Sequence, residues 1–123
     1  FRYLESRYGT YPNIVTIGPF SIEETVSVYS LGEIVLLPSK LEVFSTSYLE
    51  ALYFGKQTIV ADFSFSREIC GEYAFYFNAE SSSDLFTKLK KAPECVSAKD
   101  YVLSKFGSYV NRYGELVKVL ERC

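Results

Sequence analysis

The chain has 123 residues, of which 48% are hydrophobic and 23% charged, and its formal net charge is −2. This length and composition fit one soluble globular domain and exclude a disordered tail, a collagen-like chain and a coiled coil. The near-neutral charge argues against a nucleic-acid partner bound through bulk charge. No apolar run reaches the roughly 18 residues that a membrane-spanning helix needs.

Histidine is absent, and the only cysteines are Cys70, Cys95 and Cys123. The lack of histidine excludes His-dependent triads and His-ligated metal sites within this chain. The cysteines form no CxxC pair, which argues against a zinc site and favours a reduced cytosolic compartment. The first residues read as the end of a helix rather than as a start. We therefore interpret residues 1–123 as a single domain within a longer protein.

Strand and helix patterns alternate along the chain, separated by Gly and Pro. Short β-branched or apolar runs predict strands, and polar capping residues before amphipathic stretches predict helices; Ser21 and Glu24, for example, form a capping-box pattern. The expected strands span residues 13–17, 34–37, 58–61 and 74–77. The expected helices span residues 2–8, 21–31, 46–54, 66–71, 81–91 and 107–123.

The expected strands are continuously apolar, which is typical of strands buried on both faces of a parallel sheet. The fold class is therefore predicted to be α/β, with a partial Rossmann-like parallel sheet, flanking helices and right-handed crossovers. Residues 14–17, 34–37 and 58–61 should run parallel to one another. Such sheets bind ligands beyond the carboxyl ends of their strands, and the longest connection there spans residues 40–47.

Two glutamates, Glu42 and Glu50, lie eight positions apart around the expected start of the helix over residues 46–54. The free N–H groups and dipole of a helix N-terminus suit a phosphate, and the hydroxyls of residues 45–47 add donors there. A carboxylate suits the vicinal hydroxyls of a ribose or a sugar, so the stretch fits a nucleotide-sugar. Two alternatives stay open. Ser47 and Glu50 also match a capping box, and Glu42 is also compatible with a solvated loop position.

Residues 38–61 read P-S-K-L-E-V-F-S-T-S-Y-L-E-A-L-Y-F-G-K-Q-T-I-V-A. This stretch resembles the pattern P-S-x-x-E-x-F-G-x-x-x-x-E-A-x-x-x-G-x-P-V-V-A of the retaining glycosyltransferases of the GT-B fold, the group 1 family. Other stretches resemble further family segments in the same order: residues 13–18, 22–29, 67–69, 74–78 and 112–116. The resemblance covers nearly the whole chain and places it in the C-terminal domain of that fold.

The resemblance implies the donor-binding part of an enzyme that transfers a sugar, with retention of anomeric configuration, from a nucleotide-sugar to a glycan or lipid-linked acceptor. It implies a role in cell-surface polysaccharide or lipopolysaccharide assembly, no cofactor and no required metal. The location it implies is cytoplasmic, with contact to the inner membrane surface through an N-terminal domain. The chain alone is expected to be inactive, because that acceptor-binding domain and two strand–helix units with a basic phosphate-binding pair are missing.

Carried over residue by residue, the resemblance makes Glu42 the expected catalytic residue, in contact with the donor sugar's hydroxyls, and Glu50 a ligand of the ribose hydroxyls. The backbone at the start of the helix would face the diphosphate, and the turn over residues 18–20 would contact the nucleobase. The remaining expected donor-binding residues are Phe44, Ser45, Thr46, Ser39, Gly18 and Phe20.

The chain departs from the family pattern at Ser45, where glycine is usual and where a Cβ could hinder the ligand's approach. This departure favours the competing reading, a non-enzymatic α/β binding module that kept the scaffold. Lys40 is interpreted as a solvated lysine rather than a phosphate ligand, and Arg67 with Glu68 as a pair at a helix start rather than donor contacts. Cys70 is expected to be a core thiol.

Overall fold

The computed structural model describes residues 12–43, 45–91 and 98–107. The helix expected over residues 2–8, all of the helix expected over 107–123 except Gly107, and the expected donor-binding residue Phe44 lie outside these ranges. In chain order the described elements are α2 (Thr25–Ser30), β1 (Ile34–Leu37), α3 (Thr46–Tyr53), β2 (Gln57–Ala61), α4 (Ser64–Cys70), β3 (Phe75–Phe77), α5 (Ser82–Lys91) and α6 (Lys99–Phe106).

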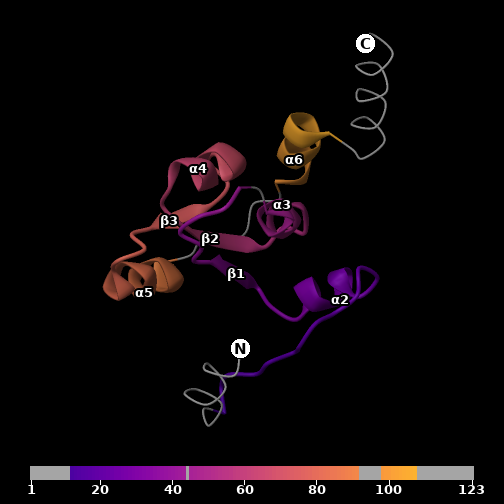
Figure 1. Cartoon of the computed structure of the whole chain (residues 1–123), viewed down its shortest axis with the longest axis horizontal. Coiled ribbons are helices and arrows are strands. Elements are labelled where there is room, and N and C mark those ends of the chain that lie inside the picture. The colour runs from indigo at the N-terminus through magenta and orange to yellow at the C-terminus, as the bar shows by residue number, and fades with distance from the viewer. Residues whose placement is uncertain (1–11, 44, 92–97, 108–123) are drawn as a thin grey trace.

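The three described strands form one parallel sheet in the order β1-β2-β3 (Figure 1). Val35 of β1 faces Thr58 of β2, and Val60 of β2 faces Tyr76 of β3. Each strand is joined to the next by a helix, α3 in the first connection and α4 in the second. The α/β class, the parallel sheet and the flanking helices are therefore confirmed.

Helices cover both faces of the central strand β2. On one face Val60 packs into a buried cluster with Tyr48 and Leu52 of α3, Ile69 and Cys70 of α4, Val102 of α6, and Ala74 and Ala98, which precede β3 and α6. On the other face Ile59 and Ala61 pack with Phe77 and, from α5, the partly buried Leu85. Figure 1 shows α3, α4 and α6 on one side of the sheet and α5 on the other. Strand β2 is thus buried on both faces, as its apolar run predicts.

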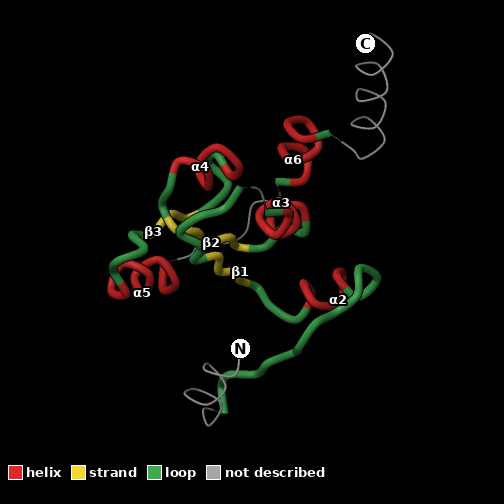
Figure 2. Tube along the Cα trace, in the orientation of Figure 1, coloured by secondary structure: helices red, strands yellow, loops and turns green. Residues whose placement is uncertain are grey.

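The prediction of a strand over residues 13–17 is wrong, because this segment is a loop that leads toward α2 (Figure 2). Its apolar side chains are exposed, with Val15 at 79% and Ile17 at 56%. β-Branched residues favour an extended backbone, but a strand forms only where a neighbour completes its hydrogen bonds. Within the described ranges β1 pairs with β2 alone, and the segment lies outside the sheet.

Strand β1 also departs from the expectation of burial on both faces. Its side chains alternate between exposed and half-buried, and Ile34 and Leu36 are 37% and 39% exposed. The reason is its place at the edge of the described sheet.

Helices α2 and α6 also differ from the expectation. Helix α2 begins at Thr25 rather than at residue 21, because turns occupy residues 22–24, and α6 was not anticipated at all.

Candidate functional site

Helix α3 begins at the loop that leaves the carboxyl end of β1, as the sequence predicts. Ser45 is its N-cap residue and makes no side-chain capping hydrogen bond. The backbone of Ser45 is extended, with φ of −128°, which any residue adopts. A serine in place of the glycine of the family pattern therefore strains nothing in the backbone at this position. The first N–H groups of an α-helix have no partner within the helix, so this end of α3 offers backbone donors.

The Glu50 carboxylate lies on the first turns of α3 and is held by a residue of α2. The Tyr29 hydroxyl donates a hydrogen bond of 3.0 Å to Glu50 Oε2 and lies 3.5 Å from the Ser47 carbonyl oxygen. Burial, followed by the hydrogen bond to Glu50 and its charge, raises the pKa of Tyr29 to about 12. The capping-box alternative for Ser47 and Glu50 is wrong, because the helix begins at Thr46 and Ser45 is its cap.

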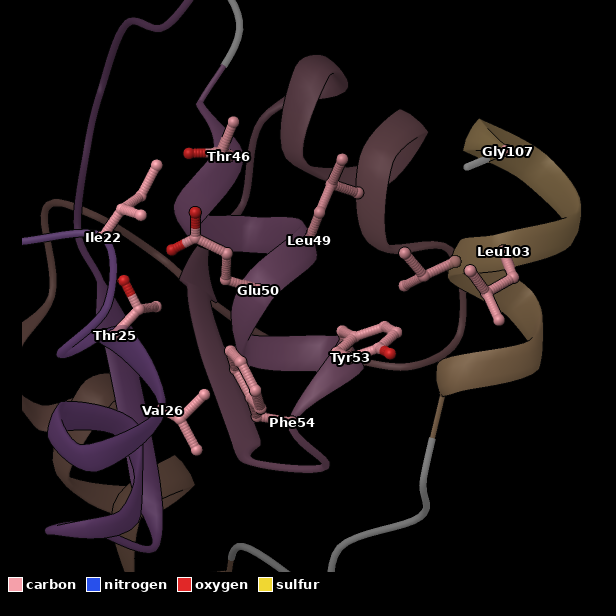
Figure 3. A pocket seen from close by; sticks show the side chains of 11 residues that line it. Ile22, Thr25, Val26, Thr46, Leu49, Glu50, Tyr53, Phe54, Leu103 and Gly107 are labelled. Atoms are coloured by element: carbon pink, nitrogen blue, oxygen red, sulfur yellow. The ribbon is translucent and has the colours of Figure 1, made fainter. Parts of the chain in front are cut away.

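A cavity of about 460 Å³ opens beside Glu50, between α2, α3 and α6 (Figure 3). Thr46 and Glu50 lie on α3, and Ile22 and Thr25 face them from the segment that begins α2. The rest of the lining is mostly apolar: Val26, Leu49, Tyr53, Phe54, Val102, Leu103 and Gly107. The cavity thus combines an apolar wall with one carboxylate, an arrangement common in small-molecule sites.

Glu42 lies in the loop before α3 and is half-buried. It makes no hydrogen bond or ion pair with the residues that the structure describes. The nearby Tyr48 hydroxyl is buried and has no hydrogen-bond partner within the described ranges. Burial raises the pKa of Tyr48, the negative charge of Glu42 raises it further, and the Ser39 side chain opposes the shift. Ser39, Glu42 and Tyr48 therefore share one neighbourhood at the end of β1.

The turn expected to contact a nucleobase does not line the cavity beside Glu50. Gly18 and Phe20 belong to the loop before α2, and Phe20 is 49% exposed. Neither residue lines the cavity beside Glu50, whereas Ile22 from the same segment does. The structure therefore brings Thr46 and Glu50 to one cavity, groups Ser39 with Glu42, and leaves Gly18 and Phe20 outside both groups.

The carboxyl ends of β2 and β3 form a second hollow of about 330 Å³, lined by Asp62, Phe63, Asn78, Ala79 and Glu80. Beside it Lys40, from the loop after β1, pairs with Glu80. Both side chains are mainly exposed, which fits the expected solvated lysine. Arg67 binds Asp62 at the same edge. These charged groups are thus paired with one another across the edge of the sheet.

Cys70 is fully buried in the cluster on the α4 face, so the expected core thiol is confirmed. Burial raises the pKa of this thiol to about 12, and Lys105 opposes the shift.

Within the described ranges, no three Cys, Asp or Glu side chains gather closely enough to hold a metal ion. None of the helices in these ranges is long and apolar enough to cross a membrane.

Sequence reasoning missed Tyr29 as a member of the site. Its place at the end of the helix pattern over residues 22–29 was the available signal. Its partner lies 21 positions away, and local spacing does not show such a contact.

Comparison with known proteins gives one kind of match. A family model described as "Glycosyl transferases group 1" matches residues 2–101, which is more than half of the chain. The comparisons with curated proteins and with solved structures found no match.

Proposed function

Since the chain belongs to the group 1 glycosyltransferases, whose role is glycosyl transfer, we propose that it is the donor-binding part of a retaining enzyme of this family. The donor is a nucleotide-sugar and the acceptor a glycan or a lipid-linked sugar. The enzyme acts at the cytoplasmic side in cell-surface polysaccharide or lipopolysaccharide assembly and requires no metal ion.

The observation that supports this proposal is the placement of the Glu50 carboxylate. Its carboxylate does not cap a helix, lines the cavity of about 460 Å³, and keeps Oε1 free of any hydrogen bond to the described residues. A carboxylate oxygen placed in this way accepts hydrogen bonds from the two adjacent hydroxyls of a ribose. Thr46, one turn earlier on α3, lines the same cavity and adds a hydroxyl.

The start of α3 binds the diphosphate of the donor, and Glu42 binds its sugar. The backbone N–H groups at Ser45 and Thr46 face the diphosphate, and the helix dipole stabilises the charge that grows on this leaving group. Glu42, which has no partner among the described residues, accepts hydrogen bonds from the hydroxyls of the donor sugar. Ser39 lies in the same neighbourhood, on the loop that closes β1.

The test is nucleotide binding by the natural full-length protein, measured by calorimetry with UDP, GDP and ADP. At least one of them should bind, and Glu50→Ala should weaken its binding roughly ten- to a hundredfold, because a hydrogen bond to a charged group contributes about 1.5–3 kcal/mol. Glu72→Ala is the matched control, since Glu72 is exposed and makes no hydrogen bond within the described ranges. If Glu50→Ala binds like the wild type, the donor-binding role of this site is wrong.

Retention has a separate test. Slow hydrolysis of the bound nucleotide-sugar, followed by proton NMR, reports which anomer of the free sugar forms first. The same anomer as in the donor supports retention, and the opposite anomer contradicts it.

A further inference from the structure

We infer that Tyr29 is the positioning residue of Glu50: its hydroxyl fixes the carboxylate so that Oε1 is ready for a ribose before the nucleotide arrives. The inference rests on the proposed function, because it presumes that Glu50 binds the donor. It names a residue of α2 that local sequence patterns around the two glutamates do not reach.

The first support is the geometry of the contact. The Tyr29 hydroxyl donates to Glu50 Oε2 at 3.0 Å, across 21 positions of sequence and between two helices. A carboxylate has about four acceptor positions, so Tyr29 occupies one on Oε2 and leaves Oε1 open. Oε1 makes no hydrogen bond with the described residues.

The second support is the way Tyr29 itself is held. Its ring stacks on Phe54 at the end of α3, with centroids 5.1 Å apart and an angle of 28° between the planes. The ring is thus held against the end of α3 while its hydroxyl binds Glu50 in the middle of the same helix. A tyrosine side chain has few rotamers, and this packing restricts them further. Tyr29 is therefore a rigid donor.

The third support is protonation. The pKa of Tyr29 is raised to about 12, so the hydroxyl keeps its proton at any physiological pH and always donates. The groups that face it are the Glu50 carboxylate and the Ser47 carbonyl oxygen, and both are acceptors. The direction of the hydrogen bond is therefore fixed.

The expected benefit is affinity. A glutamate that becomes ordered only on binding loses side-chain freedom, which costs roughly two- to tenfold in affinity per side chain. Tyr29 removes most of this cost in advance. Tyr29→Phe should therefore weaken binding of the ribonucleotide by about two- to tenfold while the ring still packs on Phe54.

The experiment uses the natural full-length protein and measures affinities for UDP, GDP and ADP and for their 2′-deoxy forms. Three variants are compared with the wild type: Tyr29→Phe, Glu50→Gln and the double variant. Tyr73→Phe is the control, because it loses the same hydroxyl at a half-exposed ring whose hydroxyl makes no hydrogen bond with the described residues. Melting temperatures are measured alongside.

We expect Tyr29→Phe to lose affinity mainly for the ribonucleotide, so that its preference over the 2′-deoxy form shrinks. In the Glu50→Gln background the same change should add little, since the two residues act as one unit. If Tyr29 had only a structural role, Tyr29→Phe would lower the melting temperature and weaken the binding of both nucleotides equally. That result would overturn the inference. If the fold-loss of affinity in the double variant equals the product of the losses in the two single variants, the inference is overturned too.

Two further outcomes separate this inference from the proposed function. If Glu50→Gln weakens binding but Tyr29→Phe does not, the positioning role is wrong and the donor site stands. If Glu50→Gln binds both nucleotides like the wild type, or none of the nucleotides binds the wild type, then both the donor site and the positioning role are wrong.

Discussion

Arg67 donates two hydrogen bonds to Asp62, from Nε to Oδ1 at 2.5 Å and from Nη2 to Oδ2 at 2.7 Å. The hydrogen bond from Arg67 lowers the pKa of Asp62, and the guanidinium also lies 4.4 Å from the centre of the Tyr76 ring. Arg67 on α4 thus joins the end of β2 to β3. The guanidinium is engaged within the protein, which favours the structural reading of Arg67 over a donor contact.

Replacement of Glu42 should separate sugar recognition from nucleotide binding. A nucleoside diphosphate has no donor sugar, so Glu42→Gln should bind it as tightly as the wild type does. Hydrolysis of the nucleotide-sugar should slow roughly ten- to a hundredfold, because a hydrogen bond to a charged acceptor is lost. Calorimetry and a hydrolysis assay on the same preparation check both halves. Weaker binding of the bare diphosphate would place Glu42 on the nucleotide instead.

Replacement of Ser66 should destabilise the fold. Ser66 is fully buried, and its hydroxyl donates to the Ala61 carbonyl at 2.6 Å and accepts from the Phe63 N–H at 3.2 Å. Ser66→Ala leaves both backbone groups without this partner, so we expect a loss of about 1–3 kcal/mol in the free energy of unfolding. Urea denaturation measures it. Ser64→Ala, at an exposed position of the same helix, should change stability by less than about 0.5 kcal/mol.

A side chain at Gly71 should also destabilise the protein. Gly71 ends α4 with φ of +56°, and a Cβ there would lie 3.1 Å from the Tyr101 hydroxyl oxygen. We expect Gly71→Ala to lower the free energy of unfolding by roughly 1–3 kcal/mol. Gly32→Ala is the control, because its φ is not positive and its Cβ would meet only the Ile34 carbonyl oxygen at 3.8 Å. Equal losses in the two variants would contradict this account.

Stability should fall at alkaline pH because of Cys70. Its pKa rises from 9.0 in the unfolded chain to about 12 in the folded protein, so the folded state holds the proton more tightly. The resulting contribution is complete below pH 9 and is lost as the pH rises toward 12. Urea denaturation at pH 8, 9 and 10 should show a decline that is smaller in Cys70→Ala. The same decline in both proteins would assign it to other groups.

Several elements were predictable because their signals are local. The run over residues 58–61 is apolar at every position except Thr58, and β2 is buried there on both faces. Helix α3 begins at Thr46 and is followed by Gly55 with φ of +65°, the residue that the sequence marks as its end. The loop with Glu42 and the start of α3 with Glu50 follow from the same pattern.

The remaining features depend on contacts that a local pattern does not contain. Residues 13–17 have strand composition, but within the described ranges no strand accepts their hydrogen bonds. Helix α6 has only one buried side chain, Val102, so its apolar pattern is weak. The contact between Tyr29 and Glu50 joins two helices and becomes visible only when α2 and α3 are placed side by side.

The central position of β2 has a consequence for the order of folding. Paired residues are close in sequence in both ladders: Ile34 pairs with Gln57, and Ile59 pairs with Phe75. Loop closure therefore favours the second ladder by only about 0.3 kcal/mol. Packing decides instead: β1 has no buried side chain, whereas β3 buries Phe77 beside β2. We expect β2, α4 and β3 to form the nucleus and β1 to join last, so that Leu36→Ala should accelerate unfolding rather than slow folding.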